Sequence, residues 1–209
     1  MRGRDISRYE YSFADLWLIN THNGIKECGI PPVDINDYPA IKAHLDTYWD
    51  KISKRYDKGD TPYNLRNCIY TDDFSKQKIV WGNLCLSAQF AWVEDEYFIN
   101  APSPMIIGGN KYLLGVLNSK ISDWYIRQLG VTRNGGYFEY KPMFVELTPI
   151  PKIDLNIQRK IETLADKIIE NKLLHKDTVA IENEIDSIMY QVYDLSNDEI
   201  MAISLSFKE

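Results

Sequence analysis

The strongest constraint on the fold is a change in residue pattern at Pro149-Ile150-Pro151. Two prolines within three residues remove backbone hydrogen-bond donors and disfavour helix in the residues before them. Beyond this point, apolar residues recur every three to five positions over residues 157–173 and again over 181–192. This spacing places them along one face of a helix. We therefore expect two segments, 1–150 and 151–209, the second beginning with an antiparallel helical hairpin.

Within the second segment, Ile161, Leu164 and Ile168 lie on one helical face, and we expect this face to pack against the first segment or a partner. Ser196 and Glu199 have the spacing of a capping box, in which each side chain satisfies a free backbone N–H of the other. A third short helix should therefore begin there.

Residues 1–150 have a different residue pattern: they are rich in aromatic and β-branched residues and are interrupted by Gly, Asn and Pro. This pattern predicts an α+β fold with a mixed or antiparallel sheet core and flanking helices. We expect strands near residues 78–81, 84–90, 96–100 and 105–107, and helices over 37–55 and over 112–127 with a break at Asn118-Ser119.

Charge and composition exclude several classes of protein. The 209 residues carry a formal net charge of −6, distributed as −1 over residues 1–150 and −5 over 151–209. This charge argues against a generic nucleic-acid-binding protein, whose affinity comes largely from an excess of Lys and Arg. No apolar run approaches the roughly 18 residues needed to cross a bilayer, and Met1–Asp5 lacks the apolar stretch of a secretion signal. We therefore expect a cytoplasmic protein. Its cysteines, Cys28, Cys68 and Cys85, should be reduced and buried.

Known catalytic motifs are missing. There is no GxSxG, Walker or HExxH sequence, and His22, His44 and His175 are far apart. We assign no catalytic residue and no metal ligand to the chain. One alternative remains open, because Asp123, Glu139 and Lys141 match the loose Asp…Glu-x-Lys pattern of metal-dependent nucleases.

Basic residues interleaved with aromatic and amide side chains are the more informative feature. Arg and Lys bind phosphates, Arg and Asn can read base edges, and Tyr offers a stacking surface. Three places combine these types: the first residues, a loop around Gly59 and Pro62, and a tight turn at Asn134-Gly135. The candidate DNA-binding residues are Arg4, Arg8, Lys54, Arg55, Lys58, Tyr63, Arg66, Asn67, Arg133, Asn134 and Tyr137. We further expect Lys54, Arg55, Lys58, Arg66 and Arg133 to face the duplex from one side of the fold.

Several short motifs occur in an order that resembles a known family. They lie in residues 3–9, 37–45, 55–66, 78–81, 112–120 and 150–151, beginning with Gly-Arg-Asp-Ile-x-Arg-Tyr. Together they resemble the C-terminal specificity domain of TaqI-like adenine-specific DNA methyltransferases and of type IIG restriction-modification enzymes, over about residues 3–175. The Leu-Asn-Ser and Ile-Pro steps also resemble repeats of type I specificity subunits.

This resemblance implies a target-recognition domain that selects a double-stranded DNA sequence for an N-terminal methyltransferase domain or subunit. S-adenosylmethionine, and possibly magnesium, would bind in the missing catalytic parts, so this chain alone would be no enzyme and hold no cofactor. It would be a fragment or a stand-alone module. There are three competing hypotheses: a module like a type I restriction specificity subunit, a metal-dependent nuclease site at Asp123, Glu139 and Lys141, and a surface that binds protein or sugar.

Overall fold

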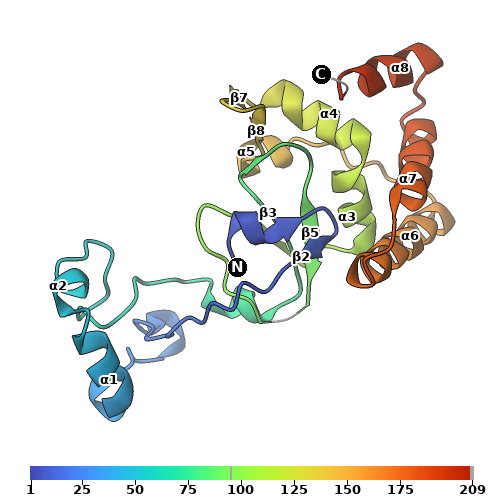
Figure 1. Ribbon diagram of the computed structural model, residues 1–209. Helices are drawn as coiled ribbons and strands as arrows, with labels where there is room; N and C mark the ends of the chain where they lie inside the picture. The colour runs from blue at the N-terminus through green and yellow to red at the C-terminus, as the bar shows by residue number, and fades with distance from the viewer. Residues whose placement is uncertain (95, 208–209) are drawn as a thin grey trace. The chain divides into compact units, whose positions relative to one another are not determined.

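The computed structural model describes residues 1–94 and 96–207, and the chain divides into two compact units. Unit 1 contains Met1–Leu16 together with the chain from Phe74 onward, and unit 2 contains Trp17–Asp73. Figure 1 labels the elements of both units. The division into segments 1–150 and 151–209 that the sequence suggests stays a prediction.

Unit 1 contains three small antiparallel sheets, in agreement with the predicted α+β fold. The first pairs β1 with β2, the second has the order β5-β3-β6, and the third has the order β4-β8-β7. The strands are β1 Ile6–Ser7, β2 Glu10–Tyr11, β3 Lys78–Trp81, β4 Leu84–Cys85, β5 Phe90–Val93, β6 Met105–Ile107, β7 Thr132–Arg133 and β8 Tyr137–Glu139.

The helices of unit 1 follow the predicted pattern closely. They are the short 3-10 helix η1 Gly3–Asp5, then α3 Lys111–Asn118, α4 Lys120–Leu129, α5 Pro142–Val145, α6 Leu155–Leu173, α7 Val179–Val192 and α8 Asn197–Leu205. The predicted break between α3 and α4 is confirmed. Asn118 exchanges two side-chain hydrogen bonds with the backbone of Phe90, at 3.0 and 2.9 Å, and Ser119 caps α4.

The C-terminal helices share the core of unit 1. Helix α3 lies between β5 and the hairpin formed by α6 and α7 (Figure 1). Ile161, Leu164 and Ile168 are buried in this core, as the sequence predicts. Ile161 approaches α3 so closely that a Cβ on Gly115 would lie 2.6 Å from its Cγ2 atom. The capping box that starts α8 is also present.

Unit 2 contains short helices and irregular loops. Its helices are α1 Pro39–Asp46 and α2 Trp49–Ile52, with 3-10 helices η2 Lys26–Cys28, η3 Ile35–Asp37 and, at its end, η4 Thr71–Ser75. Buried polar contacts hold its loops together: Asn64 is 2 % exposed and donates to the Val33 carbonyl at 2.9 Å. Thr21 donates to the Tyr63 carbonyl at 2.7 Å.

Three expectations from the sequence are wrong. The helix expected over 37–55 is interrupted after Asp46, where the Thr47 hydroxyl donates to the His44 carbonyl at 2.6 Å. Residues 96–100 form no strand and pair with none of the three sheets. Cys28 is exposed, whereas Cys85 is buried. Within the described residues, no helix combines the length and apolarity needed to cross a membrane.

Candidate nucleic-acid interface

The loop that follows α2 holds several of the predicted DNA-binding residues and is braced by two of them. Arg55 donates through Nη2 to the backbone carbonyl of Asn64 at 2.6 Å and to that of Pro62 at 3.4 Å. Lys58 donates through Nζ to the Ser53 carbonyl at 2.9 Å. Arg55 therefore supports the shape of the loop, whereas the exposed Lys58 ammonium keeps donors that can reach a phosphate.

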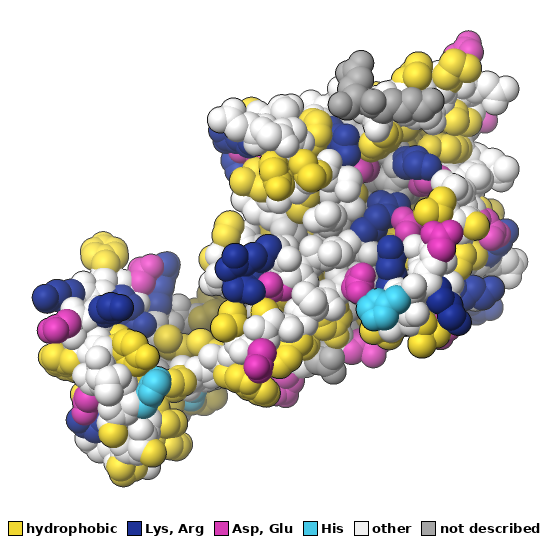
Figure 2. All heavy atoms as spheres, viewed as in Figure 1, with side chains coloured by type: hydrophobic (Ala, Val, Ile, Leu, Met, Phe, Trp, Pro, Cys, Tyr) yellow, Lys and Arg dark blue, Asp and Glu magenta, His cyan; other side chains and the backbone are white. Residues whose placement is uncertain are grey.

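Other cations of this loop are available at the surface. Lys54 is exposed and forms no ion pair within the described part of the chain. The Arg66 side chain is 73 % exposed, and its contact with Asp57 is a loose one of 3.6 Å. Figure 2 shows Lys and Arg side chains grouped around α2 and the loop after it. Such weak surface pairs are readily replaced by a phosphate.

Asn67 is exposed, but its amide is partly occupied. Its Oδ1 atom accepts a hydrogen bond from Asn23 Nδ2 at 2.6 Å. Reading adenine bidentately requires both the oxygen and the nitrogen of an Asn amide. Asn67 therefore keeps its amide nitrogen for a base or phosphate, while its oxygen is shared with the loop scaffold.

The sequence pointed to Tyr63 as a stacking surface, yet Tyr56 is the better placed aromatic residue. The Tyr63 hydroxyl donates to Asp46 at 2.6 Å, and its ring packs 5.4 Å from that of Trp49. Hydrogen bonds from Tyr63 and then from Lys42 hold the pKa of Asp46 below its usual value. Tyr56 is 99 % exposed between the cations of the same loop. Sequence pattern offered no means to separate the two tyrosines, because both lie in the same basic stretch.

In unit 1, the predicted turn at Asn134-Gly135 forms a β-hairpin. Arg133 pairs with Tyr137 across β7 and β8, so residues 134–136 make the turn. Gly135 and Gly136 have φ angles of 80° and 77°, a left-handed conformation that glycine adopts without strain. Asn134 is exposed at this tip, and Tyr137 is 43 % exposed. The hairpin thus presents all three predicted residues at the surface.

The carboxylate of Glu139 organises the base of the hairpin. Lys141 Nζ lies 2.8 Å from Glu139 Oε2, and Arg133 binds the other oxygen, with its Nε at 2.7 Å. Hydrogen bonds from Lys141 and Arg133 lower the pKa of Glu139 below its usual value. Glu139 is itself 3 % exposed, whereas the Arg133 side chain is 54 % exposed. Arg133 is therefore oriented by a buried carboxylate while part of its guanidinium stays open.

The basic cluster in the first residues separates into two roles. Arg4 is exposed, whereas Arg8 is partly buried and forms an ion pair with Glu182 of α7. Arg8 therefore has a structural partner, and Arg4 is the residue of this cluster that offers its charge to solvent.

The geometry gives no support to the nuclease alternative. Asp123 accepts from Arg127 Nε at 2.7 Å, and it also accepts from the Tyr140 hydroxyl. Glu139 is neutralised by Lys141 on one side and by Arg133 on the other. Among the described residues, no three His, Cys, Asp or Glu side chains come together in a group that could hold a metal ion. The carboxylates of Asp123 and Glu139 are thus already engaged by neighbouring cations.

The candidate residues fall in both units. Tyr56 and the cations of residues 54–66 belong to unit 2, whereas Arg4, Arg8 and the hairpin belong to unit 1. Their placement on one common face stays a prediction.

The sequence of the chain matches a known protein family. The model of the TaqI-like C-terminal specificity domain matches residues 1–151, which is more than half of the chain. Comparison with curated proteins gives no match. The matched residues include the loop after α2 and the hairpin of β7 and β8. The chain belongs to the family of TaqI-like C-terminal specificity domains.

Proposed function

We propose that this chain is the DNA-recognition module of a restriction-modification system, and that it selects the double-stranded sequence on which a methyltransferase part acts. Family membership is the observation that carries this proposal. We propose an adenine-N6 methyltransferase, as in a type IIG enzyme, as the catalytic part. The chemistry of methyl transfer would then belong to that part, and this chain would contribute affinity and sequence choice.

The surface chemistry supports DNA as the ligand. Four cations within residues 54–66 can bind phosphates, and these contacts set the position of a protein on the duplex. Arg133 would be the base reader, because a planar guanidinium that Glu139 holds through Nε and Nη2 can present its remaining N–H donors to guanine O6 and N7. Under this proposal, the loop after α2 supplies most of the affinity for DNA, and the β7–β8 hairpin supplies most of the sequence choice.

Tyr56 gives the loop a contact of a second kind. Its exposed ring lies between Lys54 and Lys58 in the sequence, on a loop that Arg55 holds in shape. An aromatic ring of this kind can stack on a base or wedge into a groove once the cations have engaged the backbone. We propose that Tyr56 makes this contact, in preference to Tyr63.

The test is a titration of the purified chain with duplexes enriched by selection from a random pool, repeated at several salt concentrations. We expect preferential binding of the enriched sequence and a linear fall of log K with log salt. Tyr56→Ala should weaken binding without changing the salt slope, while Tyr38→Ala, at a residue 50 % exposed outside this loop, should change neither. A chain that enriches no sequence and binds DNA without salt dependence would contradict the proposal.

We propose further that this chain alone neither binds S-adenosylmethionine nor methylates DNA. The glycine-rich cofactor motif and the Asn-Pro-Pro-aromatic motif of adenine methyltransferases are missing from the 209 residues. Calorimetric titration of the chain with the cofactor should give no saturable heat. Micromolar binding would instead assign a catalytic role to this chain.

A further inference from the structure

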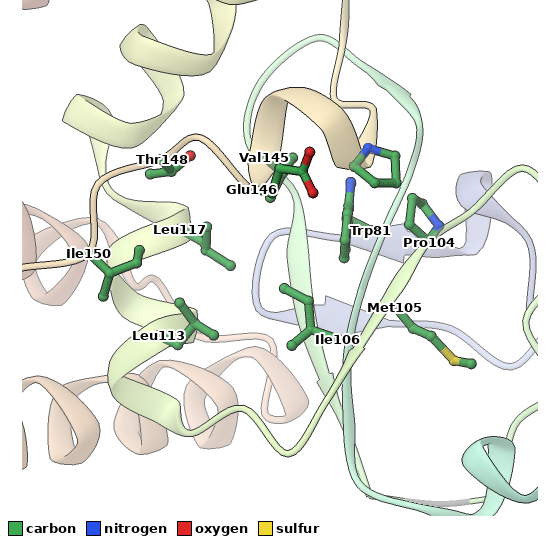
Figure 3. A pocket seen from close by; sticks show the side chains of 11 residues that line it. Trp81, Pro104, Met105, Ile106, Leu113, Leu117, Val145, Glu146, Thr148 and Ile150 are labelled. Carbon is green, nitrogen blue, oxygen red and sulfur yellow. The ribbon is translucent and has the colours of Figure 1, made fainter. Parts of the chain in front are cut away.

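Unit 1 contains a pocket of about 300 Å³ that the proposed DNA contacts do not use. Helix α3 forms one wall with Leu113 and Leu117, and Ile106 of β6 and Trp81 of β3 form another (Figure 3). Helix α5 and the segment after it close the third side with Val145. The lining is predominantly apolar, which is typical of sites that bind apolar groups.

One polar group in this lining lacks a partner. Thr148 is 6 % exposed, and its Oγ1 atom has no hydrogen-bond partner within the described residues. Its side chain faces the pocket in Figure 3. Buried hydroxyl groups are nearly always hydrogen-bonded, because leaving one unsatisfied is unfavourable. A group that enters the pocket with one hydrogen-bonding atom would satisfy it.

The size of the pocket indicates what it can take. A dry cavity of about 150 Å³ is enough to bind benzene. A pocket of about 300 Å³ therefore accommodates one large apolar side chain, of the size of Phe, Met or Trp.

The surface beside the pocket favours a protein segment over a free small molecule. Met143 of α5 is 58 % exposed, Leu147 on the turn after α5 is 55 % exposed, and Ile150 in the pocket lining is 41 % exposed. A small molecule in the pocket would leave Met143 and Leu147 in water. A protein surface with one anchoring side chain would cover them together with the pocket.

We propose that this pocket is the anchor site through which the chain docks to a protein partner. The partner inserts one large apolar side chain and donates a hydrogen bond to Thr148 Oγ1. This inference rests on the proposed function, because the methyltransferase part of the same system is the partner that such a module requires. The pocket lining contains no residue of the β7–β8 hairpin, so docking there leaves the candidate base-reading residue Arg133 outside the anchor.

The first experiment tests the pocket with two small probes, toluene and p-cresol, which differ by one hydroxyl. Saturable shifts of the Ile106, Leu113 and Leu117 methyl resonances are expected with both probes, and p-cresol should bind about fivefold more tightly. Thr148→Val should remove that preference, leave toluene binding unchanged and leave the melting temperature equal or higher. Unshifted methyl resonances, or an unchanged preference in Thr148→Val, would overturn the site.

The second experiment identifies the occupant. The full chain is titrated with the methyltransferase part of its own system, using variants that fill the pocket from opposite walls, Ile106→Trp and Leu113→Phe. Each should weaken association at least about tenfold. Met201→Trp on α8, at a residue 59 % exposed, is the matched control and should leave association unchanged. Circular dichroism confirms that each variant is folded.

The two proposals fail in different ways. Association that ignores both filling variants would overturn the anchor site, even if the chain selects a DNA sequence. If the unmodified chain selects no DNA sequence, the proposed function is wrong, whatever the pocket binds. DNA affinity of the chain alone should be the same for Ile106→Trp and the unmodified chain.

Discussion

Arg8 and Glu182 form an ion pair that joins the first residues of the chain to helix α7, with Arg8 Nε as donor to Glu182 Oε2 across 174 positions. Their side chains are only 23 % and 15 % exposed. The family match ends at residue 151, yet this contact connects the matched part to the C-terminal hairpin. The hairpin is therefore an integral part of unit 1.

The Arg8–Glu182 pair should contribute measurably to stability. Arg8→Ala removes the donor to Glu182 Oε2, while Thr178 still donates to Oε1, and we expect a loss of about 1.5 to 3 kcal/mol in the free energy of unfolding. Urea denaturation measures it. Lys160→Ala is the control, because the Lys160–Glu184 pair is 55 % and 45 % exposed and should contribute less than about 1 kcal/mol. Equal losses in the two variants would show that the burial of the Arg8 pair has no energetic consequence.

Close packing between α3 and α6 leads to a second prediction. Alanine normally stabilises a helix relative to glycine by about 1 kcal/mol. Gly115→Ala should nevertheless destabilise the protein by about 1 to 2 kcal/mol, because the new Cβ would lie 2.6 Å from Ile161 Cγ2. In an Ile161→Ala background the same change should become stabilising. A double-mutant cycle from thermal or urea unfolding checks this reversal of sign.

The same interface makes Ile161 sensitive to charge. Ile161 is fully buried, so Ile161→Asp should lower the melting temperature strongly, whereas Ile157→Asp, at a residue 38 % exposed on the same helix, should have a small effect. An unchanged melting curve for Ile161→Asp would mean that the helical hairpin of α6 and α7 does not dock on α3 in solution.

Lys58 and Arg133 should affect DNA binding in different ways. If Lys58 binds a phosphate, Lys58→Ala weakens binding to all sequences alike and reduces the salt slope by about one. If Arg133 reads guanine, Arg133→Ala costs roughly 1 to 3 kcal/mol on the preferred site only. Competition titrations on preferred and scrambled duplexes separate the two effects. If both variants change the affinity for both duplexes by the same amount, the separate roles assigned to Lys58 and Arg133 are wrong.

Stability should depend on pH through Glu139. Hydrogen bonds from Lys141 and Arg133 lower its pKa in the folded state, so the unfolded chain takes up the proton first. The stabilisation is therefore present above the ordinary Glu pKa of about 4.3 and is lost as pH falls from there through the lower folded pKa. A carboxyl NMR titration should find Glu139 titrating below that value, and Lys141→Met should raise its pKa. A pKa above the ordinary value would contradict the geometry of the hairpin.

The cysteines should react at different rates. Burial raises the pKa of Cys85 to about 12, so this thiol is both inaccessible and protonated at neutral pH. Cys28 is exposed and should react quickly with a thiol reagent in the native protein. Cys28→Ser should remove the fast phase and leave the slower reaction of the partly exposed Cys68, whereas Cys85 should react only after unfolding. A fast phase that survives in Cys28→Ser would place another thiol at the surface.

The sequence by itself determined those features that depend on residues close together in the chain. The apolar spacing around Ile161 and Ile185 is enough to locate α6 and α7, because a helix repeats every 3.6 residues. The hairpin at Asn134 and the capping box at Ser196 follow from a few neighbouring residues in the same way. The order of short motifs also identified the family that the comparison then showed.

Only the tertiary structure decided what each polar residue does. Arg55 braces its own loop and Arg8 binds Glu182, whereas the Tyr56 side chain stays in solvent. The sequence identifies these residues only as basic or aromatic and does not separate their roles. Residues 96–100 have the composition of a strand but pair with none of the three sheets. The physical reason is that burial, ion pairing and strand pairing depend on residues far away in the chain, and packing alone brings those together.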